Sequence, residues 1–332
     1  MKFGTAVGNF GTYRKSGGMP EIVEVGRRAE RLGFDSIWLH DHLFMPAAIR
    51  SRYPYNDSGV AGFAYRQDIY DPLALMGALA VRTERVEIGT SVLIVPYRNP
   101  LVLAKMLATA DQLSQGRILL GIGVGWLREE FEQLGLAEYY PVRGRVSDEW
   151  MRICIELWTG EGASSFAGEF HRFESVGAFP GCHRQPHVPI WVGGKGEIAA
   201  RRTARYGSGY HSITSTPTEL RAEIEILHRE LDKRGRDPAE VVVSMLGPTL
   251  VLDGQPRDLP ATVGCGTQQI IDALAEYARA GLEHAELMPL TLGDPTPESY
   301  MDALQYLSEE IFPALRGPPT PTPVRPRVTT RR

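Results

Sequence analysis

Three side chains able to hold or move a proton stand in a row at His40, Asp41 and His42. They end a short apolar segment, residues 35–40, which is predicted to be a β-strand. Packing does not explain three titratable groups there, although one imidazole could simply cap the last carbonyl of the strand. In one interpretation, Asp41 and His42 hydrogen-bond a flat cofactor and transfer a proton, with His40 beside them in the substrate pocket. An imidazole suits that role because it titrates near neutrality.

A metal site is the competing interpretation. His40 and His42 have the spacing of the metal pair of a barrel hydrolase, but such sites normally need further ligands from later strands. Of the later candidates, only His211 falls at the carboxyl end of a predicted strand, whereas His187 and His284 do not. The three cysteines lie far apart with no CxxC motif, which argues against structural zinc and a disulfide framework. We therefore expect no bound metal.

A glycine-rich loop, Gly193, Gly194, Lys195 and Gly196, joins the predicted strand 188–193 to the predicted helix 196–206. The free N–H groups and positive end of a helix start attract anions, and Lys195 adds charge. We predict a phosphate site here, against the alternative of a plain turn.

Two other segments place glycine in or after a predicted strand. Gly121, Gly123 and Gly125 alternate after strand 117–122, which lets a ligand approach the backbone closely. These glycines match the dinucleotide-binding fingerprint poorly, because that motif should follow the first strand of a βαβ unit and they follow the fourth predicted strand. The run 89–92 contains Gly89, Ser91 and Val92 inside a strand, and by local rules predicts a bulge.

Strands and helices alternate along the chain and would bring these residues to one end of a sheet. Strands are predicted at residues 2–8, 35–40, 86–95, 117–122, 188–193, 209–213, 241–246 and 284–288. Helices are predicted at residues 19–32, 71–82, 99–114, 144–159, 196–206, 217–234, 267–280 and 297–315. This pattern predicts a (β/α)8 TIM barrel with loop insertions, in preference to an open doubly wound sheet.

Residues 1–316 are expected to form one barrel domain, followed by a flexible Pro/Arg-rich tail at 317–332. The insertions 41–70 and 247–266 follow strands, so they belong to the face where barrel active sites lie. The insertion 160–187 follows a helix and is expected to serve packing.

The composition excludes several classes of protein. The net charge of −4 shows no basic excess for nucleic-acid binding. No apolar run approaches the roughly 18 residues of a membrane-spanning helix, and the start of the chain lacks a signal peptide's apolar core. We expect a cytoplasmic protein with a small-molecule substrate and neither nucleic acid nor membrane as partner.

Three long stretches resemble the bacterial luciferase-like superfamily: GFDSIWLHDHL, the block from ERVEIGTSVLIV to EEFEQLG, and PIWVGGKGEIAARRTARYGSGYH. Within it, the sequence is most similar to the coenzyme F420-dependent oxidoreductases, in the same order over residues 1 to 315. The resemblance implies a (β/α)8 barrel that binds the deazaflavin F420 and transfers hydride. It also implies a homodimer, because members of the superfamily pair.

The resemblance assigns roles to residues in this sequence. Asp41 and His42 match the family's pair beside the deazaflavin ring. Ser91 and Val92 match the place of a non-prolyl cis peptide behind the ring. Val124 and Gly125 match backbone positions near the cofactor, and the loop 193–196 matches its phosphate site.

One departure bears on the substrate. Sugar-phosphate dehydrogenases of this family carry an acidic Glu where this chain has Trp126, so a flatter or more apolar substrate is expected, with Trp126 in its pocket. The alternative within the superfamily is an FMN-dependent monooxygenase, since FMN shares the ring shape and the phosphate. A non-catalytic cofactor carrier is the third hypothesis, although a carrier has little need for an imidazole at the ring.

Overall fold

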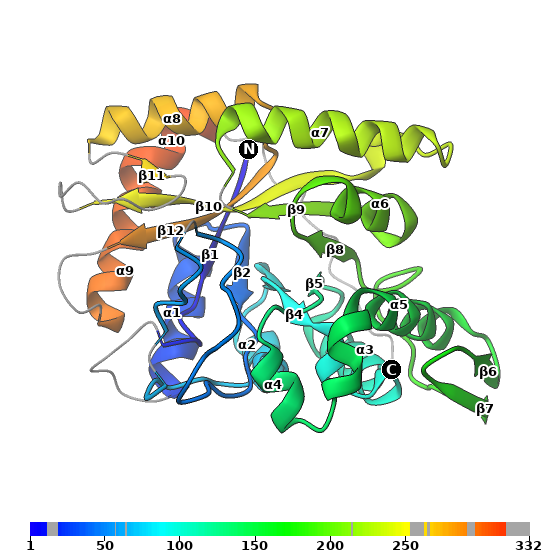
Figure 1. Cartoon of the computed structure of the whole chain (residues 1–332). Coiled ribbons are helices and arrows are strands. Elements are labelled where there is room, and N and C mark those ends of the chain that lie inside the picture. Colours follow the sequence, from blue (N-terminus) through cyan, green and yellow to red (C-terminus); the bar gives the residue numbers. More distant parts are fainter. Residues whose placement is uncertain are drawn as a thin grey trace, which may run out of the picture.

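Eight parallel strands close into a barrel (Figure 1). The computed structural model describes residues 1–11, 19–56, 58–63, 65–213, 215–252, 262–263, 266–290 and 296–316. The barrel strands are β1 (Lys2–Ala6), β2 (Ser36–Leu39), β3 (Glu87–Thr90), β5 (Ile118–Gly123), β8 (Ile190–Gly193), β9 (Gly209–Ile213), β10 (Val242–Val251) and β12 (His284–Leu290). Each pairs in parallel with its neighbours, and the β9–β10 and β12–β1 pairings complete the ring. The predicted (β/α)8 barrel is confirmed.

Helices cover the outside of the barrel, and local signals fix several of their starts. They are α1 (Met19–Arg31), α2 (Pro72–Arg82), α3 (Pro100–Ser114), α5 (Arg143–Thr159), α6 (Gly196–Tyr206), α7 (Pro217–Asp232), α8 (Thr267–Arg279) and α9 (Pro297–Tyr306). The side chains of Asp71 and Asn99 accept hydrogen bonds from the first amides of α2 and α3, each with proline at the next position. The helix predicted at 297–315 is divided into α9, a π-turn at Leu307–Ile311 and α10 (Phe312–Arg316).

The structure corrects several predicted elements. The strand predicted at 86–95 is two pieces, β3 and β4 (Leu93–Ile94), separated by a cis peptide between Ser91 and Val92. Strand β10 runs on to Val251, so part of the predicted 247–266 insertion is strand, and residues 253–261 lie outside the described residues. Two further elements went unpredicted: α4 (Arg128–Gln133) and the antiparallel hairpin of β6 (Ser164–Ala167) and β7 (Arg172–Val176). Both are too short to show a clear hydrophobic period.

The domain boundary remains a prediction, because the tail 317–332 lies outside the described residues. Among the helices that are described, none combines the length and the apolar character needed to cross a membrane.

Aromatic and polar side chains fill the barrel interior, where branched aliphatic residues usually dominate. The rings of Trp38 and Trp191 lie 5.4 Å apart at its centre. They fit because glycine stands opposite each: a Cβ on Gly89 would lie 2.4 Å from Trp38, and one on Gly209 would lie 2.4 Å from Trp191. The glycine within the predicted strand 86–95 therefore makes room for an indole ring.

Candidate active site

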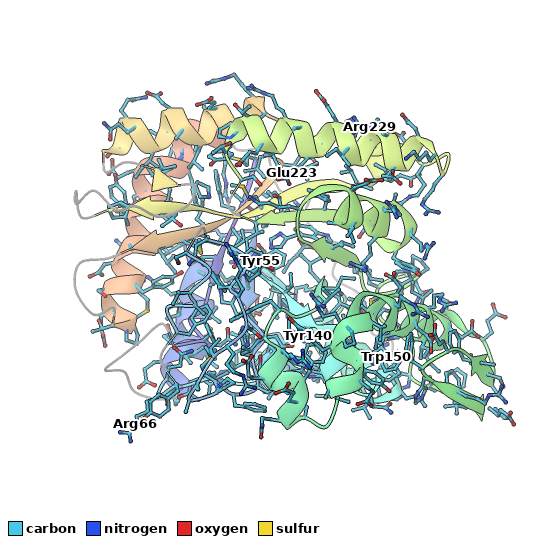
Figure 2. The ribbon with its side chains drawn as sticks, in the orientation of Figure 1. Tyr55, Arg66, Tyr140, Trp150, Glu223 and Arg229 are labelled. Atoms are coloured by element: carbon cyan, nitrogen blue, oxygen red, sulfur yellow. The ribbon has the colours of Figure 1, made fainter. Side chains whose placement is uncertain are left out.

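One cavity of about 570 Å³ opens at the carboxyl ends of the barrel strands. It is lined by almost every residue predicted for the site: His40, Asp41, His42, Ser91, Val92, Val124, Gly125, Trp126, Gly193, Gly194 and Lys195. Gly196 follows directly as the first residue of α6. Figure 2 labels Tyr55 and Tyr140, which line the same cavity from the 41–70 insertion and from the turn at Ala137–Val142. Segments far apart in the chain thus meet at one site.

His42 is held by a buried carboxylate. Its Nδ1 lies 2.5 Å from Oε2 of Glu130, which is fully buried on α4. The same carboxylate accepts hydrogen bonds from the Leu43 amide at 2.8 Å and the Tyr97 hydroxyl at 2.9 Å. Burial, and then the charge of Glu130, raise the pKa of Tyr97 well above its usual value, so this hydroxyl stays a donor. Since Nδ1 is engaged, Nε2 is the His42 nitrogen left for a ligand.

Helix α4 also fixes the start of the 41–70 insertion. Besides the Glu130 contacts, the carboxylate of Glu129 accepts from the amides of Arg50 and Ser51 at 2.7 and 3.1 Å, and from the Ser51 hydroxyl at 2.7 Å. The insertion is therefore tied down where it passes the cavity.

Asp41 lies in the wall behind His42. Its carboxylate receives two hydrogen bonds from Arg98, at 2.7 and 3.0 Å, and one from the Ile94 amide at 2.8 Å. Burial raises the pKa of the Asp41 carboxyl, and the guanidinium and the amide act in the opposite direction. Burial alone would lower the pKa of Arg98, but Asp41 and Asp71 raise it. With its oxygens taken by these donors, Asp41 suits the positioning of His42 better than proton transfer.

His40 also has defined partners. Its Nδ1 lies 2.6 Å from the carbonyl oxygen of Ser91, and its backbone is held on both sides by the amide group of Asn9. Among the residues the structure describes, His40 and His42 join no cluster of three potential metal ligands.

Glycine and Val92 form the floor of the cavity. A Cβ on Gly123 would lie 2.4 Å from a Val92 methyl group, and one on Gly193 would lie 2.5 Å from the other. A Cβ on Gly121 would lie 1.8 Å from the carbonyl oxygen of Thr90. The cis peptide that the resemblance implied lies at this point, between Ser91 and Val92. The floor thus consists of Gly123 and Gly193 with the Val92 side chain packed against them, whereas Gly121 lies against the Thr90 backbone and does not line the cavity.

The loop before α6 has the geometry expected of an anion site. Gly194 and Gly196 have φ angles of 127° and 70°, which side-chain-bearing residues rarely adopt. Among the described residues no side chain caps α6, Lys195 is exposed at its start, and Arg202 lines the cavity about two turns further on. Arg202 is paired with Asp148 at 2.6 Å. The Gly194 amide donates to the His211 carbonyl at 3.1 Å, so a phosphate would meet the amides of the first turn of α6 and nearby positive charge.

Aromatic rings surround His42. Phe10 stacks on its imidazole at 5.0 Å, and Trp126 meets it edge-on at 6.1 Å. Tyr53 contacts both Trp126 and Phe63, at 5.1 and 5.6 Å. Burial raises the pKa of Tyr53 to about 12, so its hydroxyl is neutral. We call Phe10, Tyr53, Phe63 and Trp126 the aromatic wall.

Sequence reasoning found Trp126 but missed Glu130, Arg98 and the rest of the aromatic wall. Glu130 is 88 positions from His42 and carries no local signal beyond being acidic. The three other rings come from a loop and from an insertion, where no periodicity identifies a buried face.

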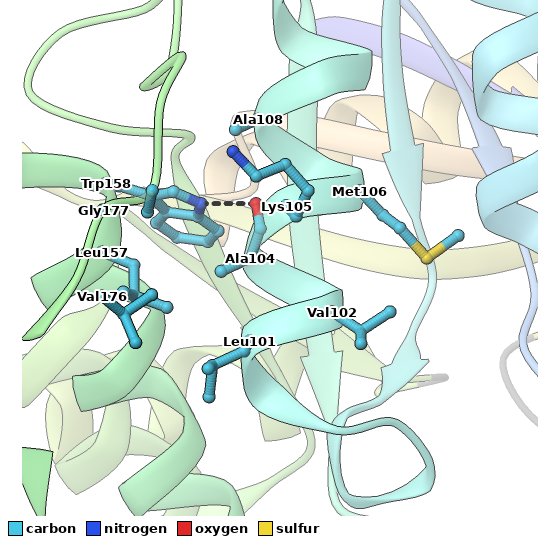
Figure 3. A pocket seen from close by; sticks show the side chains of 11 residues that line it. Leu101, Val102, Ala104, Lys105, Met106, Ala108, Leu157, Trp158, Val176 and Gly177 are labelled. Carbon is cyan, nitrogen blue, oxygen red and sulfur yellow. Dashed lines mark hydrogen bonds between the residues drawn. The ribbon is translucent and has the colours of Figure 1, made fainter. Parts of the chain in front are cut away.

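A second cavity of about 330 Å³ lies outside the barrel, between α3, α5 and residues 176–178 (Figure 3). Its lining is apolar apart from Lys105. The Trp158 indole N–H donates to the Ala104 carbonyl at 2.9 Å. It offers no acid–base pair, so the chemistry belongs to the first cavity.

Comparison with known proteins adds a family and several relatives. The family model described as luciferase-like monooxygenase matches residues 1–259. The chain is 34% identical over 229 residues to a protein of Microbacterium testaceum named F420-dependent glucose-6-phosphate dehydrogenase, covering 68% of this chain and 62% of that one. A protein of the same name from Amycolatopsis mediterranei is 34% identical over 206 residues, covering 61% and 56%. The chain thus spans less than two thirds of the length of these relatives.

Solved structures of similar fold include enzymes of different chemistry. An F420-dependent secondary alcohol dehydrogenase, in complex with an F420–acetone adduct, superposes with a TM-score of 0.76 at 21% identity, over 95% of this chain and 99% of that one. The monooxygenase RslO1 of Streptomyces bottropensis gives 0.74 at 21% identity, over 94% and 99%. At such identities the likeness shows the fold alone.

Proposed function

Because the chain belongs to the luciferase-like monooxygenase family, we propose that it is an oxidoreductase that transfers a hydride between coenzyme F420 and a small organic substrate. The observation that carries the proposal is the meeting of three features in one cavity: the His42–Glu130 pair, the glycine floor and the loop before α6. The relatives named F420-dependent dehydrogenases support F420 as the cofactor.

The residues present fit this cofactor. Its flat ring needs a surface without large side chains, and the floor offers Gly123 and Gly193 packed against the two methyl groups of Val92. Its phosphate needs backbone donors and positive charge, which the start of α6 and Lys195 provide. When bound, F420 supplies the carbon that gives or accepts the hydride.

His42 would move the proton that accompanies hydride transfer. Glu130 holds Nδ1 and stabilises the protonated ring, so Nε2 can take a proton from a substrate hydroxyl or return one to a carbonyl. Asp41 and Arg98 keep the backbone beside His42 in place. Phe10 and Trp126 of the aromatic wall pack against the imidazole, which is only 12% exposed.

The cavity favours a neutral, apolar or flat substrate over a sugar phosphate. Trp126 stands where sugar-phosphate dehydrogenases of the family carry an acidic Glu. Two cations lining the cavity are already committed: Arg143 to the carbonyl groups of Gly125 and Tyr140, and Arg202 to Asp148. Apart from Arg52 and Lys195, the remaining lining is mainly aromatic and aliphatic.

We also propose that copies of the chain pair through the outer faces of α2 and α3. These faces carry apolar side chains that are between 38% and 60% exposed: Val81, Val102, Met106 and Leu113.

Titration with both cofactors tests the proposed function. The purified chain is expected to bind F420 more tightly than FMN, as measured by the change in cofactor fluorescence. It is also expected to reduce F420 with apolar alcohols or to oxidise reduced F420 with apolar ketones. Preference for FMN, with oxygen consumed when reduced FMN is added, would contradict F420 dependence and favour the monooxygenase alternative.

Lys195→Ala is expected to weaken F420 binding by about 1–3 kcal/mol, as for loss of a charge-assisted hydrogen bond. The loss should shrink at high salt, because screening already weakens the charge. Gly194→Val should weaken binding more, since valine is strained at a φ of 127°. Calorimetric titration with F420 measures the affinity of both variants. Lys233→Ala, which removes another exposed lysine in a distant part of the sequence, is the control. Unchanged affinity in both loop variants would place the phosphate elsewhere.

A further inference from the structure

A chain of buried polar side chains leads from the cavity floor into the barrel. The Ser91 hydroxyl lies 3.0 Å from Nε2 of His211, whose Nδ1 lies 3.0 Å from the Ser244 hydroxyl. Ser244 then contacts Nδ1 of His284 at 3.1 Å, and Nε2 of His284 contacts Ser36 at 2.8 Å. All five residues are at least nine-tenths buried. Only Ser91 and His211 line the cavity, and the proposed function assigns no role to the others.

Glu286 lies beside this chain without the hydrogen bonds a buried carboxylate needs. Its side chain is fully buried on β12, and neither oxygen has a hydrogen-bond partner among the described residues. The nearest basic atom in that part of the molecule is Nε2 of His211, 3.4 Å from Oε2. A lone buried carboxylate is costly, so Glu286 either takes up a proton or pairs with a charged His211.

The geometry around His211 suits a charged ring, because the Glu286 carboxylate, unpartnered among the described residues, lies 3.4 Å from its Nε2 and an indole face lies against it. Burial, followed by the nearby His211, lowers the pKa of His284 to about 3, so His284 is neutral. Burial raises the pKa of Tyr300, the other titratable group close to Glu286, so it is neutral too. Trp38 stacks on the His211 ring at 5.1 Å with 13° between the planes, and the face of an indole attracts a cation. The ring of Trp191 lies at 6.2 Å.

We propose that Glu286 holds His211 as an imidazolium beneath the cavity floor, and that this ion pair fixes the Ser91 hydroxyl and supplies positive charge under the bound cofactor. His211 is thus a positioning residue of the cofactor site. The second half of this inference rests on the proposed function, because it names F420 as the group above Ser91.

If the Glu286–His211 ion pair serves cofactor binding, its loss should change a different measured quantity than if it serves only stability. Replacing a buried ion pair by uncharged groups is often neutral or stabilising. Once Glu286 is uncharged, His211 can release its proton, so no unpaired charge remains. The functional reading therefore predicts weaker cofactor binding without loss of stability, whereas a structural role predicts loss of stability with binding retained in the folded fraction.

The experiment has one arm without cofactor and one with it. The arm without cofactor uses NMR of the protein labelled with ¹⁵N-histidine, in which the His211 signals are identified by their loss in His211→Gln. We expect these signals to show a charged ring at pH 7.5. In Glu286→Gln they should show the neutral form. Glu286→Gln and His211→Gln should each bind F420 about tenfold or more weakly, as for a charge-assisted contact. Ser36→Ala, at the far end of the chain, should bind as the wild type does.

Each result supports or overturns the inference. A neutral His211 in the wild type overturns the ion pair, and unchanged F420 affinity in both variants overturns its role. A lower melting temperature for Glu286→Gln, with unchanged affinity, assigns the pair to structure alone. If Glu286→Gln does not fold, that too overturns the inference, and His211→Gln still reports on affinity. Absence of F420 binding by the wild type overturns the proposed function, while the histidine signals still decide the ion pair.

Discussion

Replacing His42 by alanine is expected to lower kcat for hydride transfer by about 10²–10⁴-fold, the usual contribution of a general acid or base. The reason is that a buried carboxylate holds Nδ1 of His42, which leaves Nε2 facing the cavity beside the aromatic wall. Affinity for F420 should change little, since the floor and the loop before α6 remain intact. Steady-state turnover and cofactor titration on the same preparation measure the two effects separately.

Glu130→Gln is the matched variant. It keeps the shape and the contact with the Leu43 amide but removes the charge that stabilises protonated His42. We expect a smaller fall in kcat than for His42→Ala. Turnover that survives both substitutions would show that another group moves the proton. Turnover absent from the wild type with every substrate tested would favour the carrier hypothesis.

Replacing Arg98 by methionine is expected to lower the free energy of unfolding by about 3–5 kcal/mol, because removing one partner of a buried pair leaves the other charge uncompensated. The side chain of Asp41 is fully buried and that of Arg98 is 10% exposed, so water cannot take over the pairing. Asp71, the N-cap of α2, loses the same partner. Urea unfolding followed by circular dichroism gives the value.

Two comparisons test this cause. The double variant Arg98→Met with Asp41→Asn should recover part of the loss, because the buried charge of Asp41 is gone and the remaining Asp71 carboxylate is 38% exposed. Arg128→Met removes an exposed arginine that pairs with Glu132 and should cost less than about 1 kcal/mol. An Arg98→Met variant as stable as this control would show that the Asp41 pair does not hold the site together.

The elements of the barrel could be predicted because their signals are local. Asp71 and Asn99 with the prolines after them start two helices at the predicted places, and apolar runs mark most of the strands. Strand β10 was predicted too short because Gly247 and Pro248 interrupt its apolar run, yet it pairs with β12 on both sides of a register shift there. The backbone hydrogen bonds between β10 and β12 therefore continue the strand past the two residues that locally favour a turn.

The site could be predicted only where its residues are adjacent in the chain. Asp41 with His42, and the loop 193–196, have short motifs that the family resemblance recognises. The other site residues have partners far away in the chain. Glu130 is 88 positions from His42, Arg98 is 57 from Asp41, and Glu286 is 75 from His211. Their roles depend on which strands are neighbours, and a single sequence contains no direct record of that.

The contrast between the glycine floor and the aromatic wall has a consequence for how this protein can diverge. A substitution at Gly123 or Gly193 would push a side chain into Val92, so the proposed cofactor surface is closed to change. Tyr53 and Phe63 lie outside the barrel strands, on an insertion that α4 anchors near its start. Mutation can therefore reshape substrate preference repeatedly while the cofactor surface is inherited unaltered. Directed evolution toward new substrates should start from these two rings.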